Sequence, residues 1–188
     1  MTRWSAIATT LLISLNLPAQ QPEEKKDDPG AIGDEHRILA KLAGDFDIQQ
    51  KEFGEEGKLK GELTGVLTRT MILDGRFLQE EAEVKGKSRT TKIMVTIGFD
   101  RRKKKFVSVT VNNQTTLPYV AEGTWDVAKK EITFIDEEFD PITMKLVART
   151  REIHRILSDD EQLIEEYVAL GDKSEYRTLE IRYTRKGK

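Results

Sequence analysis

Residues 96–127, TIGFDRRKKKFVSVTVNNQTTLPYVAEGTWDV, decide the fold that we predict for this chain. They indicate three β-strands in succession. TIGFD leads into a charged turn, FVSVTV returns, and YVAEGTWDV runs back again after a short loop. Apolar and polar residues alternate within these strands, as expected where one face of a sheet is buried. The stretch therefore predicts an antiparallel meander.

The same pattern extends through the rest of the chain. We predict ten strands, at residues 45–53, 59–72, 76–84, 91–100, 106–113, 119–127, 131–137, 143–154, 162–170 and 175–185. Most connections between them are too short for a parallel crossover, so consecutive strands must be antiparallel neighbours. The predicted fold class is therefore all-β, either an up-and-down, lipocalin-like barrel of about ten strands or a strongly curled sheet. Closure into a barrel would remove the exposed edges.

One short helix is predicted ahead of the strands, at residues 34–43. Ile38, Leu39 and Leu42 form an apolar stripe on it, and His36 lies away from that stripe. We therefore expect His36 to face solvent. Because a helix this short is marginal on its own, we expect it to dock on an open end of the barrel.

The first 19 residues have the features of a secretory signal peptide. Arg3 supplies the positive charge, residues 6–17 are apolar, and Ala19 precedes a polar segment, so cleavage after Ala19 is expected. A short membrane anchor is the alternative, but the apolar run falls short of the about 20 residues that span a bilayer. The protein is expected to be secreted or periplasmic, with no stable membrane anchor after cleavage.

Two further segments complete the predicted domain organisation. Residues 20–33 combine charge blocks with proline and glycine and are predicted to be a disordered linker. Residues 34–188 are predicted to form the barrel domain.

Composition excludes several classes of function. The net charge is −2 with both signs interspersed, which is not the pattern of a nucleic-acid-binding protein. The absence of cysteine excludes disulfides, thiolate metal sites and a cysteine nucleophile. With only His36 and His154, no multi-histidine metal site is expected. No catalytic motif is present, and we predict no catalytic residue, metal or cofactor. Composition leaves the oligomeric state open.

Two charged segments have both a binding and a surface interpretation. The basic run at residues 101–105 has the charge to bind phosphates or an anionic membrane, but its place in a hairpin turn favours a solvated turn that discourages edge pairing. The acidic segment at residues 136–140 lacks the ligand spacing and central glycine of a calcium loop, so a solvated loop is favoured.

A barrel of about ten strands predicts either a cavity or a core filled by large side chains, because eight strands already leave room for one small ligand. Glu166 lies on an otherwise apolar face. It is either a rim residue or half of an ion pair with Arg149 or Arg151, or else a carboxylate that orients a ligand. The candidate ligand-binding residues are Arg76, Phe99, Thr110, Trp125, Arg151, Glu166 and Tyr167.

An ordered set of short motifs resembles the bacterial domain-of-unknown-function family 1579. The motifs are Leu-Ala-Gly at residues 42–44, Gly-Arg-Phe at 75–77, Gly-Phe-Asp at 98–100 and Tyr-Thr-Arg at 183–185. The resemblance implies a calycin-type barrel, similar to lipocalins and fatty-acid-binding proteins, and no known reaction. Residues 45–46 and 110–113 depart from tryptophan-containing segments of the family, so a pocket built from those aromatic residues would be altered here.

A more distant likeness concerns haem. Gly123-Thr124-Trp125 resembles an element of the haem-binding nitrobindin barrels. Those proteins need a histidine close to the C-terminus, and the last two predicted strands contain none, so haem is not expected.

Three functions remain open from the sequence. The first is an exported barrel that binds a small apolar or amphipathic molecule. The second is a structural or interaction barrel with a filled core, in which Phe99, Phe106, Trp125 and Tyr167 occupy the interior. The third is an enzyme that uses interior carboxylates or arginines, which would require convergent titratable groups with shifted pKa values.

Overall fold

The computed structural model describes residues 30–139 and 142–187, and within them the chain forms one helix and ten strands. The chain divides into a unit Met1–Ala31 and a unit Ile32–Lys188, and the fold described below belongs to the second. The predicted signal peptide, residues 1–19, lies outside the described residues, as do residues 20–29 of the predicted linker. No helix in the described ranges is long and apolar enough to cross a membrane.

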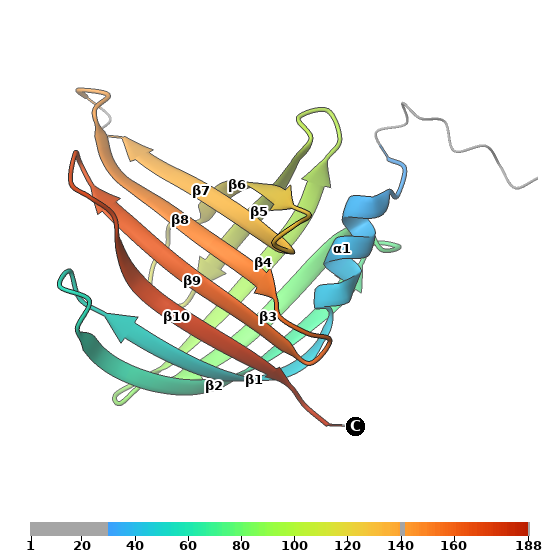
Figure 1. Ribbon diagram of the computed structural model, residues 1–188, viewed down its shortest axis with the longest axis horizontal. Coiled ribbons are helices and arrows are strands. Elements are labelled where there is room, and N and C mark those ends of the chain that lie inside the picture. Colours follow the sequence, from blue (N-terminus) through green and yellow to red (C-terminus); the bar gives the residue numbers. More distant parts are fainter. Residues whose placement is uncertain (1–29, 140–141, 188) are drawn as a thin grey trace, which may run out of the picture. The chain divides into compact units, whose positions relative to one another are not determined.

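The described strands form a closed antiparallel barrel in which each strand pairs with its neighbours in sequence, and β1 pairs with β10 (Figure 1). The elements are α1 (Asp34–Leu42), β1 (Gly44–Phe53), β2 (Leu59–Ile72), β3 (Phe77–Lys85), β4 (Thr90–Asp100), β5 (Lys105–Asn112), β6 (Tyr119–Asp126), β7 (Glu131–Phe139), β8 (Leu146–Ile156), β9 (Glu161–Leu170) and β10 (Tyr176–Arg185). The predicted barrel with one short helix is confirmed. The largest difference from the predicted ranges is the start of β8, which begins at Leu146 instead of residue 143.

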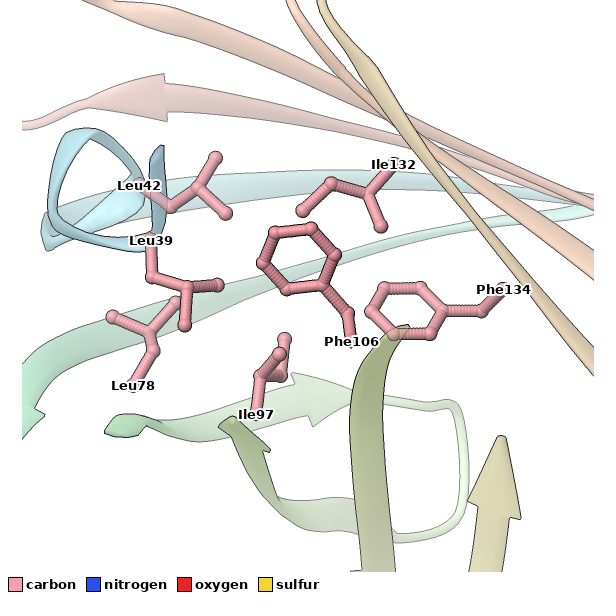
Figure 2. Close-up of a cluster of buried hydrophobic side chains, with 7 residues drawn as sticks. All are labelled: Leu39, Leu42, Leu78, Ile97, Phe106, Ile132 and Phe134. Carbon is pink, nitrogen blue, oxygen red and sulfur yellow. The ribbon is translucent and has the colours of Figure 1, made fainter. Parts of the chain in front are cut away.

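Helix α1 lies at one end of the barrel, against β2, β3 and β4. Leu39 and Leu42 of the helix join inward-facing side chains of the barrel in a buried apolar cluster, which we call the end cluster. Its members are Leu39, Leu42, Leu78, Ile97, Phe106, Ile132 and Phe134. Figure 2 shows the Phe106 ring between the two leucines of α1 and Phe134. The predicted docking of the helix on the barrel end is therefore observed, and it closes that end with apolar side chains.

The expectation that His36 faces solvent is wrong. Its side chain is buried, and its ring packs edge-on against Phe99 with 6.5 Å between the ring centroids. Its Nδ1 atom accepts a hydrogen bond of 3.0 Å from the backbone N–H of Gly33, which precedes the helix. Burial lowers the pKa of His36 from its ordinary value, and the nearby arginines act in the same direction. The docked face of α1 is thus centred on Leu39, with His36 and Leu42 three residues to either side.

Gly65 of β2 lies close to the backbone of β3. It pairs with Val84 of β3, and a Cβ atom at this position would lie 2.2 Å from the carbonyl oxygen of Glu83 and 3.0 Å from the Cα atom of Val84. Both are backbone atoms, so a side chain cannot be accommodated without moving β3 away from β2. The close approach of these two strands therefore requires glycine.

We predict that Gly65→Ala lowers the free energy of unfolding by about 1–3 kcal/mol, the usual cost of overpacking. Gly61→Ala is the matched control on the same strand, because a Cβ atom there meets only the Glu52 carboxylate at an ordinary 3.6 Å. Urea denaturation followed by circular dichroism measures both variants. Equal stability of the two variants would contradict the proposed role of Gly65.

Candidate functional site

The barrel interior contains a cavity of about 520 Å³, to which all the described strands contribute side chains. It begins beside the end cluster, where Ile97 and Phe134 line it, and extends toward the opposite end of the barrel, where Asn112 and Tyr119 line it. The end cluster thus fills only part of the interior. This volume lies within the range of sites for small organic molecules.

Strand β5 places its polar residues inside and its valines outside. Ser108, Thr110 and Asn112 line the cavity. Val109 and Val111 face outward and are 40% and 41% exposed. Because small hydroxyl and amide side chains occupy the inner face of β5, this part of the wall does not fill the interior as a row of valines would. The orientation of β5 therefore helps to keep the barrel hollow.

A buried arginine crosses the interior beside the cavity. The Nε atom of Arg69 on β2 lies 2.9 Å from Oε1 of Glu80 on β3, and Arg69 also donates a hydrogen bond to Gln162 on β9. Its guanidinium lies over the ring of Tyr183, 4.7 Å from the centroid. Gln162 in turn donates to the carbonyl oxygen of Leu42, the last residue of α1, at 3.5 Å. These contacts pair the charge of Arg69 and link the barrel interior to the docked helix.

Glu152 and His154 lie on the inner face of β8. His154 Nε2 is hydrogen-bonded to a carboxylate oxygen of Glu152, and the His154 ring packs edge-on against Phe134. Burial disfavours ionisation of Glu152, but the charge and hydrogen bond of His154, together with the charge of Arg69, outweigh it. The pKa of Glu152 therefore lies below its ordinary value, and the residue is ionised at neutral pH.

Glu166 on β9 lies directly opposite Glu152 in the β8–β9 register, and both line the cavity. Burial raises the pKa of Glu166, and the negative charge of Glu152 adds to the effect, although a hydrogen bond from Thr178 opposes it. The Thr178 hydroxyl donates to Glu166 at 2.5 Å. Thr178 is the extra residue of a β-bulge in β10, between Arg177 and Leu179. The bulge therefore supplies the hydrogen bond that holds one oxygen of Glu166.

Two of the candidate residues predicted from the sequence, Thr110 and Glu166, line the cavity. Phe99 and Trp125 pack instead against the end cluster, and Phe99 lies edge-on to Phe106 with 5.0 Å between centroids. Arg76 lies in the β2–β3 turn, where it contacts the carbonyl oxygen of Leu73. These three residues belong to the helix end of the barrel and do not line the cavity.

Arg151 and Tyr167 lie on the outer face of the barrel. Arg151 makes two hydrogen bonds to Glu175 and lies over the Tyr167 ring, 4.3 Å from its centroid. Successive residues of a strand point to opposite faces, so Arg151 and Tyr167 cannot share the interior with their neighbours Glu152 and Glu166. The proposed ion pair of Glu166 with Arg149 or Arg151 is wrong for the same reason, since Arg149 pairs with the outward-facing Glu137.

Sequence reasoning missed Glu152 and His154, although β8 carries a signal that could have found them. Arg149, Arg151 and Arg155 share one parity on this strand. Three arginines on one face mark the solvent side, so the opposite parity, which contains Glu152 and His154, must point inward. No comparable signal exists for Arg69, whose partners come from β3 and β9 and are distant in sequence.

In the described part of the chain, no group of three or more histidine, aspartate or glutamate side chains is arranged to hold a metal ion. The chemically distinctive feature of the site is the pair of facing carboxylates, Glu152 and Glu166. The pKa of Glu152 is lowered and that of Glu166 is raised. Glu152 is therefore ionised under conditions in which Glu166 holds its proton more readily.

We predict opposite effects of pH in the variants Glu152→Gln and Glu166→Gln. The lowered pKa of Glu152 means that its contribution to stability is present at neutral pH and is lost as the pH falls. Glu152→Gln should therefore cost about 1–2 kcal/mol at pH 8 and less at pH 4. The raised pKa of Glu166 means that this residue increasingly opposes folding as the pH rises. Glu166→Gln should therefore stabilise by roughly 0.2–1 kcal/mol at pH 8 and have little effect at pH 4.

Urea denaturation at the two pH values measures both effects. A loss of stability in Glu166→Gln at pH 8 as large as that in Glu152→Gln would show that the two carboxylates do not differ as described.

Known structures share the barrel fold. The structure of Rv2717c from M. tuberculosis is 13% identical in sequence, with a TM-score of 0.61, and the match covers 84% of this chain and 100% of that one. The S-type phycobiliprotein lyase CPES from Guillardia theta is 11% identical, with a TM-score of 0.57, over 85% of this chain and 96% of that one. Both likenesses concern the fold alone.

Comparison with curated proteins finds no match. The profile of the family described as "Protein of unknown function (DUF1579)" matches residues 31–185, which include α1, every described strand and the whole cavity. The resemblance noted in the sequence motifs is thereby confirmed, and the chain belongs to the DUF1579 family.

Proposed function

We propose that this protein binds a small molecule with a substantial apolar part in the interior of its barrel. The observation that carries the proposal is the cavity of about 520 Å³, because an interior of this size is left unfilled although the helix end is closely packed. Side chains that line a cavity of this size forgo packing contacts that a filled core would make. A ligand that occupies the cavity would recover those contacts.

The lining supports a ligand of mixed character. Ile93, Val95 and Ile97 of β4 present an apolar wall, while Glu152 and Glu166 present a polar one. Pockets for small molecules typically combine a mostly apolar lining with a few polar groups that fix orientation. A barrel whose core is completely filled, the second function considered from the sequence, would not leave such a lining accessible.

We also propose that the protein acts outside the cytoplasm, as a secreted or periplasmic protein. The support is the sequence of residues 1–19, with its positive charge, apolar run and small residue at the expected cleavage position. This second proposal concerns the compartment in which the protein acts, and it does not depend on the cavity. The phycobiliprotein lyase of Guillardia theta shares the fold, and at 11% identity its activity is not carried over to this chain.

We predict that the wild-type protein binds N-phenyl-1-naphthylamine, an uncharged apolar dye that fluoresces when it leaves water. Thr110→Trp places a large side chain in the cavity and should weaken binding at least about tenfold, because the indole occupies the space that the dye needs. Val109→Trp is the matched control, since the neighbouring position on the same strand faces outward and is 40% exposed. Fluorescence titration of the three proteins gives the dissociation constants.

Two results would contradict the proposal. One is the absence of dye binding to the wild-type protein. The other is equal loss of binding in both tryptophan variants, which would place the dye on the outer surface. Circular dichroism melts of the variants show whether each remains folded before it is titrated.

One observation favours a second candidate function, an enzyme that moves protons inside the barrel. Glu152 and Glu166 face each other in the cavity, and their pKa values shift in opposite directions. Pairs of carboxylates with separated pKa values serve as base and acid in many active sites. Binding remains the function that the geometry supports best, because the cavity is present whatever the protonation of these two residues.

A further inference from the structure

Four of the five acidic side chains that line the cavity form one continuous patch. Glu138 and Asp136 lie on β7, Glu152 on β8 and Glu166 on β9, and all four line the cavity. Glu152 pairs across strands with Glu166 on one side and with Phe134 on the other. Asp136 lies two residues from Phe134 on the same face, so it is a diagonal neighbour of Glu152. Three consecutive strands thus present carboxylates to the same space.

The cavity wall has fewer cationic side chains than carboxylates. No lysine or arginine of the described residues lines the cavity, and His154 is the one lining side chain there that can become positive. Arg69 lies behind the lining, and its charge is paired with Glu80. His154 is paired with Glu152. Asp136, Glu138 and Glu166 have no ion-pair partner among the described residues, so carboxyl groups outnumber cationic side chains on the cavity wall.

A second feature independently indicates a ligand with a polar group. The side chain of His154 is 6% exposed and lines the cavity, and its Nδ1 atom is buried without a hydrogen-bond partner. Nε2 of the same ring is hydrogen-bonded to the Glu152 carboxylate, so Nδ1 is the ring nitrogen left without a partner. A buried polar atom without a hydrogen-bond partner is costly. A polar group on a ligand would satisfy it.

The wall opposite the patch is mostly apolar, and the carboxylate of Glu80 on β3 is paired there with Arg69. In the strand order of the barrel, β3 lies five places from β8 in either direction, and β4 lies five places from β9. Ala82 of β3 and Ile93, Val95 and Ile97 of β4 line the cavity there. One side of the cavity therefore suits a cation or a hydrogen-bond donor, and the facing side suits hydrocarbon.

We propose that the ligand is an amphipathic amine, with its ammonium group on the β7–β9 carboxylates and its hydrocarbon part against β3 and β4. This inference rests on the proposed function and narrows it to a substrate class. It excludes fatty acids and other amphipathic anions, whose carboxylate would meet the acidic patch without an available lysine or arginine among the cavity-lining residues of the described chain. An organic cation supplies the charge and the hydrogen-bond donors that the patch lacks.

The test compares three probes with the same twelve-carbon chain, dodecylamine, 1-dodecanol and dodecanoate, at micromolar concentration and pH 7. Displacement of N-phenyl-1-naphthylamine reports their affinities. We expect the amine to bind at least about tenfold more tightly than the alcohol, and the alcohol more tightly than the carboxylate. The double variant D136N/E166Q should remove the preference for the amine and leave the affinity of the alcohol within about twofold.

The matched control is E137Q/E165Q, which removes the same formal charge from the outer faces of the same two strands. Glu137 and Glu165 pair there with arginines. This variant should keep the preference for the amine. If the D136N/E166Q protein does not fold, E138Q alone should show a smaller loss of the same preference.

The outcomes separate the two proposals. Binding of the alcohol with no preference for the amine would overturn the inference and leave the proposed function intact. Binding of neither the alcohol nor the dye would overturn the proposed function and the inference with it. Equal preference for the amine in the wild type and in D136N/E166Q would also overturn the inference, because the selectivity would then arise elsewhere.

Discussion

The pairing of β1 with β10 is the constraint on which the rest of the structure depends. It closes the described strands into a cylinder, so that no strand edge is left to pair with another chain. A cylinder of this many strands is wider than the eight-stranded barrels whose interior one layer of side chains can fill. Closure therefore determines the interior width, and the sequence must either fill the interior or leave a cavity.

The chain does both, at opposite ends. At the helix end, Leu39 and Leu42 of α1 add apolar volume that the strands alone do not supply, and Phe106 packs between them and Phe134 (Figure 2). Away from the helix, small and polar residues such as Ser108, Thr110 and Ala121 face inward and line the cavity. The boundary between packed and hollow interior is thus set by residue size along each strand.

Charge inside the barrel requires compensation, because a buried ion without a partner is far more costly than a paired one. Arg69 receives that compensation from Glu80, from Gln162 and from the rings of Tyr183 and Phe46. The carboxylates of the cavity receive less. In the same interior, Arg69 thus has an ion-pair partner, although its Nε and Nη2 atoms lack hydrogen-bond partners, whereas Asp136, Glu138 and Glu166 have no ion-pair partner among the described residues.

The fold was predictable because the sequence signals for strands and turns are local. The site was harder to predict because its residues come together from strands that are distant in sequence. Turn residues and period-two alternation locate the strands, and short connections fix their antiparallel order. Which face points inward is harder to infer where both faces of a strand are partly apolar or partly polar. Arg151 and Tyr167 were expected in the cavity, but they point outward because their neighbours Glu152 and Glu166 point inward. Arg69 has partners on β3 and β9 that only the closed barrel brings together.

Glu152 and Glu166 face each other across β8 and β9, although two carboxyl groups in this arrangement are unfavourable for stability. Burial disfavours the ionised form of Glu166, and the negative charge of Glu152 on the neighbouring strand disfavours it further. A purely structural barrel has no need of such a pair, since an apolar residue at position 166 would pack against Ile164 and Val168 on the same face. Instead, a bulge in β10 places the Thr178 hydroxyl on Glu166 and holds that carboxylate in position. A group held in this way fits the proposed binding of a cation, because a cation in the cavity would relieve the unfavourable interaction.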